Sequence, residues 1–268
     1  GTAFNGHSRM AAAAVLETAL QESLRAAEEI WGDDFAVAAN TASIDLDTLY
    51  DIGRRLDQSA PDSPVAKDFW DRLAAVPAQQ LVSRLESQIV YFAEREGQVV
   101  TVHVDADASL RLLPVRYQTV TDALVHVAKN IATHAPDPPE MRAAAGKPPA
   151  LQVWINISRE PANSSIFRLS IRDDGCGADT GRMRARLMLK APDTDAIAAM
   201  SDDAILQTIF DDDTTSIDKV TETSGRGVGL GALRSAVTEL GGRIYAESIA
   251  GEGLCLHITL PVFSRIAG

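Results

Sequence analysis

The chain has 268 residues, which suggests one large domain or two ordinary ones. Asp and Glu number 37 against 25 Lys and Arg, so the formal net charge is −12 at pH 7. This acidity argues against a broad surface for nucleic acid or for anionic membranes, because both need clustered Lys and Arg. It leaves room for a small anionic ligand held in a locally positive pocket.

The sequence has no apolar stretch that approaches the roughly 18 residues of a membrane span. The opening residues, GTAFNGHSRM, also lack the basic and apolar regions of a signal peptide. The two cysteines, Cys176 and Cys255, are too few for a disulfide scaffold. We therefore expect a cytoplasmic protein with no membrane span in this chain.

Residues 1–75 are predicted to form a helical region of their own. Apolar residues recur there at steps of three and four along two stripes: Leu16, Leu20, Leu24, Ala27 and Trp31, then Leu46, Leu49, Ile52 and Leu56. Ser63 and Pro64 are typical of the start of a third helix. The apolar residues of that helix would be Phe69, Trp70 and Leu73. Such helices must bury their stripes on each other, on a second copy, or on the rest of the chain.

Residues 76–268 mix helices and strands. Helices are predicted over 78–97 and after Pro114, and strands over 98–105, 151–158, 167–172, 243–249 and 254–261. The last four strands form two hairpins. This order predicts an α+β two-layer sandwich, with a mixed, largely antiparallel sheet and helices on one face.

Two segments of this part are expected to be irregular. Residues 136–149 hold five of the twelve prolines and are predicted to be a loop. Residues 191–222 contain nine acidic residues and one Lys, so most of that segment is expected to be a mobile surface region.

A first motif that could carry chemistry is the helix LVHVAKNIATHA. His126, Asn130 and Thr133 share one face, with Lys129 beside them, opposite the apolar stripe of the helix. An imidazole, an amide oxygen and an ammonium group together can hold a metal ion and its phosphates. The alternative is an ordinary polar helix face.

A second motif is the turn Asp173-x-Gly175-x-Gly177, which follows a predicted strand. Glycines allow a positive φ and let a flat ligand approach the backbone. A carboxylate at the end of the strand could accept a hydrogen bond from an exocyclic amine and so select adenine. The alternative is a plain β-turn.

A third motif is the glycine-rich start of the last predicted helix, SGRGVGLGALRSAVTELGG. Free backbone N–H groups at a helix N-terminus can hold an anion, and Arg226 adds a cation. The motif alone is weak evidence, because it matches neither the dinucleotide-binding fingerprint nor a GxxxxGK[ST] loop.

The polar helix, the Asp-x-Gly-x-Gly turn, the acidic segment and the glycine-rich helix start follow one another in this order within about 110 residues. In this combination the chain resembles the histidine-kinase-like ATPase superfamily, which includes gyrase, mismatch-repair and heat-shock chaperone ATPases. The similarity is strongest to the ATP-binding catalytic domain of the CheA family of chemotaxis histidine kinases. It covers roughly residues 74–262, and it includes the linker PPEMRAAAGKPP, which is characteristic of the chemotaxis branch.

The resemblance implies an ATP·Mg²⁺ site. Asn130 would coordinate Mg²⁺ through its side-chain oxygen, while Lys129 and His134 would approach the phosphates. The loop before the last helix would cradle the phosphates with Gly225, Arg226, Gly227 and Gly229.

The resemblance also implies roles at the base and at the reacting group. Asp173 would bind the adenine amine, and Gly175 and Gly177 would shape the base pocket. His126 stands where the superfamily has a residue that orients or activates the attacking group. The enzyme would be a protein histidine kinase, in which catalysis is mostly positioning and charge neutralisation.

The same resemblance implies partners. The five histidines of the chain lack the following acidic residue that is usual for an acceptor His, so the phosphoacceptor histidine would lie on a separate domain. A response regulator would act downstream. The helices of residues 1–75 occupy the position of a dimerisation domain, so a homodimer is expected. The alternative is that they pack on their own catalytic domain.

Two departures from the family pattern favour an alternative function. Thr133 stands where the chemotaxis pattern usually has Asp, and Asp211, Asp212 and Asp213 add negative charge to the presumed lid over the nucleotide. The alternative is a catalytically degenerate nucleotide-binding or protein-interaction scaffold of the same fold. A serine kinase of anti-sigma type is disfavoured by the linker and the N-terminal helices.

Overall fold

The computed structural model describes residues 46–59, 63–190, 194–211 and 229–263. Its contacts divide the chain into two units, residues 1–52 and 53–268, with the boundary inside helix α3 (Leu46–Ser59). The first predicted apolar stripe, from Leu16 to Trp31, lies outside the described residues. Within these ranges no helix is long and apolar enough to cross a membrane.

The predicted third helix begins as expected and then changes its geometry. In α4 (Pro64–Asp68) the Ser63 hydroxyl accepts a hydrogen bond from the backbone N–H of Ala66 at 3.0 Å. The chain continues as a π-helix, η1 (Phe69–Ala74). The wider π turn alters which residues share a face. Phe69 and Trp70 are buried, whereas Leu73 is 67% exposed, so its predicted place on the apolar face is wrong.

Gly53 of α3 lies against the aromatic rings of the following helical segment. A Cβ atom at Gly53 would collide with the rings of Trp70 and Phe69, so only glycine lets these rings approach the helix. The Trp70 indole N–H donates to Asp57 Oδ2 at 2.9 Å. Ile52, which was predicted to lie on the apolar stripe, is exposed.

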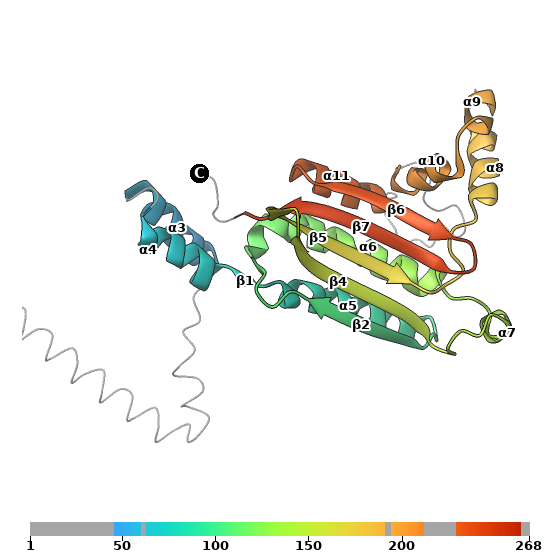
Figure 1. Ribbon diagram of the computed structural model, residues 1–268, viewed down its shortest axis with the longest axis horizontal. Helices are drawn as coiled ribbons and strands as arrows, with labels where there is room; N and C mark the ends of the chain where they lie inside the picture. Colours follow the sequence, from blue (N-terminus) through green and yellow to red (C-terminus); the bar gives the residue numbers. More distant parts are fainter. Residues whose placement is uncertain (1–45, 60–62, 191–193, 212–228, 264–268) are drawn as a thin grey trace, which may run out of the picture. The chain divides into compact units, whose positions relative to one another are not determined.

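A five-stranded sheet forms one layer of the larger unit (Figure 1). Its order is β2 (Val100–Ala106), β4 (Leu151–Glu160), β5 (Asn163–Asp173), β7 (Gly253–Pro261) and β6 (Arg243–Ile249). The β2–β4 pair is parallel and the other three pairs are antiparallel. A separate two-stranded sheet pairs β1 (Val76–Pro77) with β3 (Arg111–Leu112).

Helices cover one face of this sheet (Figure 1). They are α5 (Ala78–Arg95), α6 (Gln118–His134), which follows the 3-10 turn η2 (Pro114–Tyr117), and α11 (Leu230–Glu239). α5 and α11 both pack on α6. The α+β two-layer architecture predicted from the sequence is thereby confirmed.

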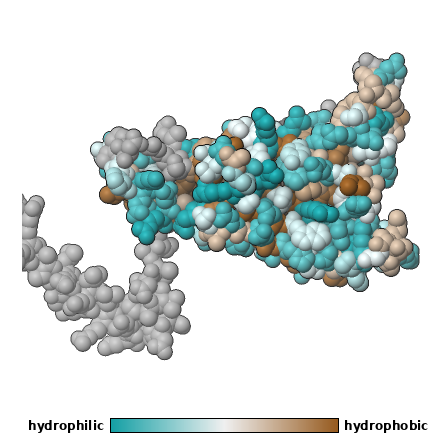
Figure 2. Space-filling model, viewed as in Figure 1, coloured by the Kyte–Doolittle hydropathy of each residue, from teal (hydrophilic) through white to brown (hydrophobic). Residues whose placement is uncertain are grey.

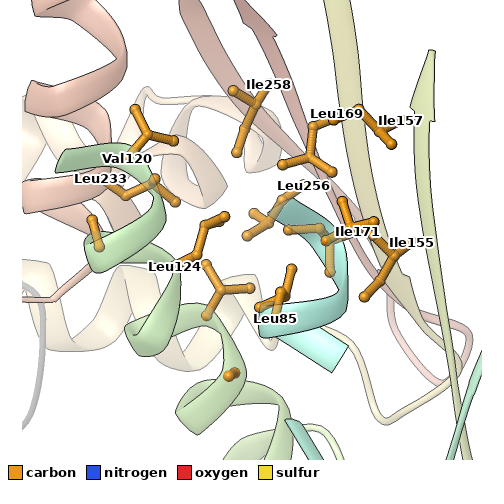
Figure 3. Packing of buried hydrophobic residues seen from close by; sticks show 14 of the residues in the cluster. Leu85, Val120, Leu124, Ile155, Ile157, Leu169, Ile171, Leu233, Leu256 and Ile258 are labelled. Atoms are coloured by element: carbon orange, nitrogen blue, oxygen red, sulfur yellow. The ribbon is translucent and has the colours of Figure 1, made fainter. Parts of the chain in front are cut away.

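The core lies between the helices and the sheet. Figure 3 shows Leu85 of α5 and Leu124 of α6 facing Ile155, Ile171 and other side chains of the strands. The predicted inward positions of α6, Val120, Leu124, Ala128 and Ile131, are all buried. The alternation of buried and exposed residues along β4 and β5 places the other set of side chains on the far face of the sheet.

The far face of the sheet is mixed in character. His103 stacks on Trp154, and the Arg172 guanidinium lies over the Trp154 ring at 5.7 Å. Tyr245 stacks on His257 in the same way. Figure 2, seen from the side on which the strands lie in front, shows hydrophilic residues with scattered apolar ones over this layer.

Two segments expected to be irregular are partly helical. The 136–149 loop contains the short helix α7 (Pro139–Ala144). After α8 (Thr180–Lys190), the acidic segment forms α9 (Thr194–Ala198), α10 (Asp202–Gln207) and the 3-10 turn η3 (Thr208–Phe210).

The prediction of a surface segment is therefore wrong for the end of α10 and for η3, whereas α9 has no buried residue. Ile205, Leu206 and Phe210 are buried, whereas Asp202 and Asp203 before them and Asp211 after them are exposed. The Gln207 side chain also pairs with the backbone of Ala246, donating to its carbonyl at 2.8 Å and accepting from its N–H at 3.1 Å. Residues 191–193 and 212–222 lie outside the described residues.

Candidate functional site

The polar face of α6 carries the side chains predicted to hold phosphates and metal. His126 and Asn130 are half-buried, whereas Lys129 and His134 are exposed. The Asn130 amide makes no hydrogen bond with any described residue, so its oxygen is available to a ligand. A half-buried, unpartnered amide oxygen fits one position in the coordination shell of Mg²⁺.

The charge state of His126 follows from its surroundings. Partial burial lowers the pKa of the imidazole below its usual value, and the positive charge of Lys129 lowers it further. The imidazole is therefore neutral at neutral pH and can accept a proton.

Asp173 is the last residue of β5 and is 4% exposed. Its Oδ1 accepts hydrogen bonds from the backbone N–H of Gly175 at 2.9 Å and of Leu254 at 3.4 Å. Its Oδ2 accepts none from the described residues. Burial raises the pKa of this carboxyl group, and the two backbone hydrogen bonds oppose that shift. The result is a fixed, desolvated carboxylate with one oxygen left for a donor.

The glycines of the turn let it lie against the end of α6. A Cβ atom at Gly175 would collide with the carbonyl oxygen of Ala135, and that oxygen accepts from the Cys176 N–H at 2.9 Å. Gly177 has a φ of +71°, which disfavours any other residue. The structure therefore brings the turn predicted to bind the base directly against the end of the helix that carries Asn130 and His134.

The β6–β7 hairpin holds the turn from the opposite side. The Ser248 hydroxyl accepts from the Ala178 N–H at 2.8 Å and donates to the Gly253 carbonyl at 2.9 Å. The Gly251 N–H donates to the Cys176 carbonyl at 2.7 Å. The turn is thus fixed by two elements that are far apart in the sequence.

A buried group of four charged residues lies beside the turn and was not predicted as part of the site. It consists of Asp137, Arg142, Lys147 and Asp174, and we call it the charge network. Three of its members lie in or next to the linker that indicated the family. The pairing with Asp174 carries no sequence signal, because it joins residues 32 positions apart.

The predicted phosphate loop is described only at its end. Gly229 is the N-cap of α11, and its carbonyl accepts from the Ala232 N–H at 3.2 Å. Gly225, Arg226 and Gly227 lie outside the described residues, so their roles stay predictions. Among the residues that are described, no group of three or more His, Cys, Asp or Glu could hold a metal ion.

A hollow of about 550 Å³ lies between η3 and α11, and it differs from the predicted site. Phe210, Gly231 and Arg234 contribute to its wall, whereas α6 and the Asp173 turn do not. It is wide open to solvent and is crossed by an exposed ion pair between Arg234 and Asp211 at 2.9 Å. The predicted ligand site, at Asp173 and the polar face of α6, is thus separate from this hollow.

The sequence comparison shows the family to which this two-layer fold belongs. Residues 119–264 match the model of the histidine kinase-, DNA gyrase B- and HSP90-like ATPase family, and the chain belongs to that family.

Within this family the chain is similar to proteins named chemotaxis protein CheA. It is 29% identical over 188 residues to that of Halobacterium salinarum and 28% identical over 207 residues to that of Rhizobium meliloti. The matches cover 70% and 74% of this chain but only 28% and 26% of those relatives. Among solved structures, a mycobacterial sensor histidine kinase, MprB, is 16% identical with a TM-score of 0.44, over 70% of this chain and 97% of that one.

Proposed function

We propose that this chain is the ATP-binding catalytic part of a chemotaxis-type histidine kinase, with Mg²⁺ as its cofactor. The observation that carries the proposal is Asp173, a buried carboxylate with one unpaired oxygen, held against the helix end that bears Asn130 and His134. Membership of the ATPase family and the similarity to CheA proteins support it.

Each residue has a role in this proposal. Asp173 Oδ2 accepts a hydrogen bond from the adenine amine. Asn130 would hold Mg²⁺, which when bound neutralises phosphate charge. Lys129 and His134 would approach the phosphates, since both side chains are exposed to solvent. Gly225, Arg226, Gly227 and Gly229 would cradle the phosphates, as the family resemblance implies.

The reaction proposed is phosphoryl transfer to a histidine of a separate domain. A nitrogen of the acceptor imidazole forms a bond to the γ-phosphorus, the bond from that phosphorus to the bridging oxygen breaks, and ADP leaves with the electron pair. His126 is neutral and can orient the acceptor or take its proton. A response regulator then receives the phosphoryl group. The protein would act in the cytoplasm as a homodimer.

Calorimetric titration with ATP, in the presence and absence of Mg²⁺, tests nucleotide binding. We expect binding that Mg²⁺ strengthens, and we expect Asn130→Ala to remove most of that Mg²⁺ effect while leaving metal-free binding nearly unchanged. Absence of binding at millimolar ATP would refute the proposal.

Transfer needs a separate measurement, namely movement of label from γ-labelled ATP to a histidine-containing acceptor domain. Thr133, which replaces the usual Asp, favours a second candidate function, a scaffold that binds nucleotide without catalysis. Its Oγ1 donates to the Lys129 carbonyl at 2.9 Å rather than to the ligand side of the helix. ATP binding without label transfer to any acceptor, including after Thr133→Asp, would favour the scaffold.

A further inference from the structure

The charge network is buried and electrically balanced. The side chains of Arg142, Asp137, Lys147 and Asp174 are 4%, 6%, 14% and 15% exposed. Two positive and two negative charges thus lie in a site from which water is largely removed. Each charged side chain in such a site keeps its position, because water cannot replace an ion-pair partner that moves away.

Arg142 is the centre of this network. Its Nη2 donates to both carboxylate oxygens of Asp174, at 3.1 and 2.9 Å, and its Nη1 lies 3.4 Å from Asp137 Oδ2. Its Nε donates to the Pro148 carbonyl at 2.9 Å and its Nη2 also to the Ala150 carbonyl at 3.0 Å. All three guanidinium nitrogens are used, a pattern that lysine cannot reproduce.

Arg142 also reaches the peptide group that orients Asp173. Its Nη1 lies 3.4 Å from the Asp174 carbonyl oxygen. The N–H of that same peptide group belongs to Gly175 and donates to Asp173 Oδ1 at 2.9 Å. The peptide group is therefore held at its oxygen by Arg142 and in turn holds the carboxylate of Asp173.

The next peptide group is held in the same manner. Lys147 Nζ donates to the Gly175 carbonyl at 2.9 Å and to Asp137 Oδ2 at 2.8 Å. The N–H of this peptide group, from Cys176, donates to the Ala135 carbonyl at the end of α6. Two successive peptide groups thus connect the charge network to both parts of the proposed site.

We infer that Arg142 is a positioning residue that fixes the Asp173 carboxylate through the 174–175 peptide group and so sets the selectivity for adenine. This inference rests on the proposed function, because it takes Asp173 as the group that reads the base. Arg142 itself does not touch the nucleotide in this scheme. Its loss frees the peptide group, and the carboxylate then no longer meets the amine in one fixed orientation.

The test compares the affinities of the full chain for ATP and inosine triphosphate, both with Mg²⁺. Inosine carries an oxygen where adenine carries the amine, so the ratio of the two affinities reports how well the carboxylate is placed. We expect the wild-type protein to prefer ATP at least 10-fold, and Arg142→Lys to reduce this ratio at least 5-fold. Arg142→Ala should reduce it further, toward 1.

Two controls separate positioning from stability and charge. Val82→Ala removes buried volume from α5 and lowers stability, but it should leave the ratio unchanged. Arg168→Ala removes an exposed arginine of β5, paired with Glu160 at 2.8 Å, and should also leave the ratio unchanged. An unchanged ratio in both Arg142 variants would overturn the inference.

Amide hydrogen exchange keeps the inference testable if Arg142→Ala does not fold. The amides of Gly175 and Cys176 should exchange at least 10-fold faster in Arg142→Lys and in Lys147→Met, and unchanged exchange would overturn the inference. If the wild-type protein binds neither nucleotide, the proposed function fails while this exchange test still decides the positioning. If it binds both equally, ATP binding stands and the role of Asp173 as base reader fails.

Discussion

Asp173 carries a charge that its surroundings disfavour. Burial raises the pKa of this carboxyl group above the ordinary value of 3.8, so the folded protein takes up a proton more readily than the unfolded chain. Stability therefore falls as pH rises from 3.8 through the raised pKa. This stability cost is expected of a binding residue, because the free Oδ2 of Asp173 can accept a hydrogen bond from a ligand.

Asp173→Asn should accordingly separate stability from binding. Asparagine can still accept from the N–H groups of Gly175 and Leu254, and it removes the buried charge. We expect a higher thermal midpoint at pH 7, with a gain that shrinks toward pH 4, and a loss of ATP affinity of roughly 10- to 100-fold, as for a charge-assisted hydrogen bond.

Scanning calorimetry at several pH values and ATP titration measure the two effects. Asp179→Asn, at an exposed position after the turn, serves as the control and should change neither. Wild-type affinity in Asp173→Asn would contradict the assignment of Asp173 to the base.

Single residues were predictable from the sequence where one residue type is decisive. The turn of Asp173, Gly175 and Gly177 was predicted to follow a strand, and the structure places it at the end of β5, whereas its role at the base stays a prediction. The buried pairing of Arg142 was not predicted, because it depends on Asp174, which lies 32 positions later and directly after β5, and on burial that periodicity does not reveal.

At the scale of elements, the contact between the Asp173 turn and the end of α6 depends on a missing side chain. Gly175→Ala would place a methyl group against the Ala135 carbonyl, so the turn and the helix must move apart. We expect a loss of about 1–3 kcal/mol in the free energy of unfolding, as for overpacking, together with weaker ATP binding.

Gly181→Ala is the matched control, because it makes the same chemical change in α8. The nearest atom to a Cβ there is Asp179 Oδ1 at 3.4 Å, and the position has an ordinary helical backbone. We expect this variant to be neutral or more stable by up to about 1 kcal/mol. Denaturant unfolding compares the two, and equal stabilities would show that the turn has room that the structure does not indicate.

Elements were predictable where the apolar period was long and regular. α6 and both hairpins of the sheet follow their predicted patterns. The π-helix η1 and the helices of residues 194–211 did not, because tertiary contacts decide them. Trp70 packs where Gly53 leaves space, and Gln207 pairs with the backbone of β6.

At the scale of the whole molecule, the larger unit contains its own core. The buried cluster of the sheet and its helices runs from Ala78 to Leu260. η1 precedes this core and is hydrogen-bonded to β3. The Arg111 guanidinium donates to the carbonyls of Asp71 at 2.9 Å and Ala75 at 2.5 Å. A cut at the predicted boundary near residue 75 would remove these acceptors, so a shortened chain should begin at residue 46.

That shortened chain tests the predicted homodimer. We expect residues 46–268 to fold, to bind ATP as the full chain does, and to be monomeric by light scattering, whereas the full chain has twice its 28.7 kDa mass. The apolar stripe of residues 16–31 would supply the dimer contact.

Point variants of the full chain make the same test without a deletion. Leu20→Glu together with Leu24→Glu puts two charges into the stripe and should weaken the dimer at least about 100-fold, because an unpaired charge is costly in an apolar contact. Thr18→Glu adds a charge on the opposite face of the same predicted helix and should leave the dimer intact. A monomeric wild-type chain would refute the dimer, and a dimer that survives both glutamates would place the contact elsewhere in the chain.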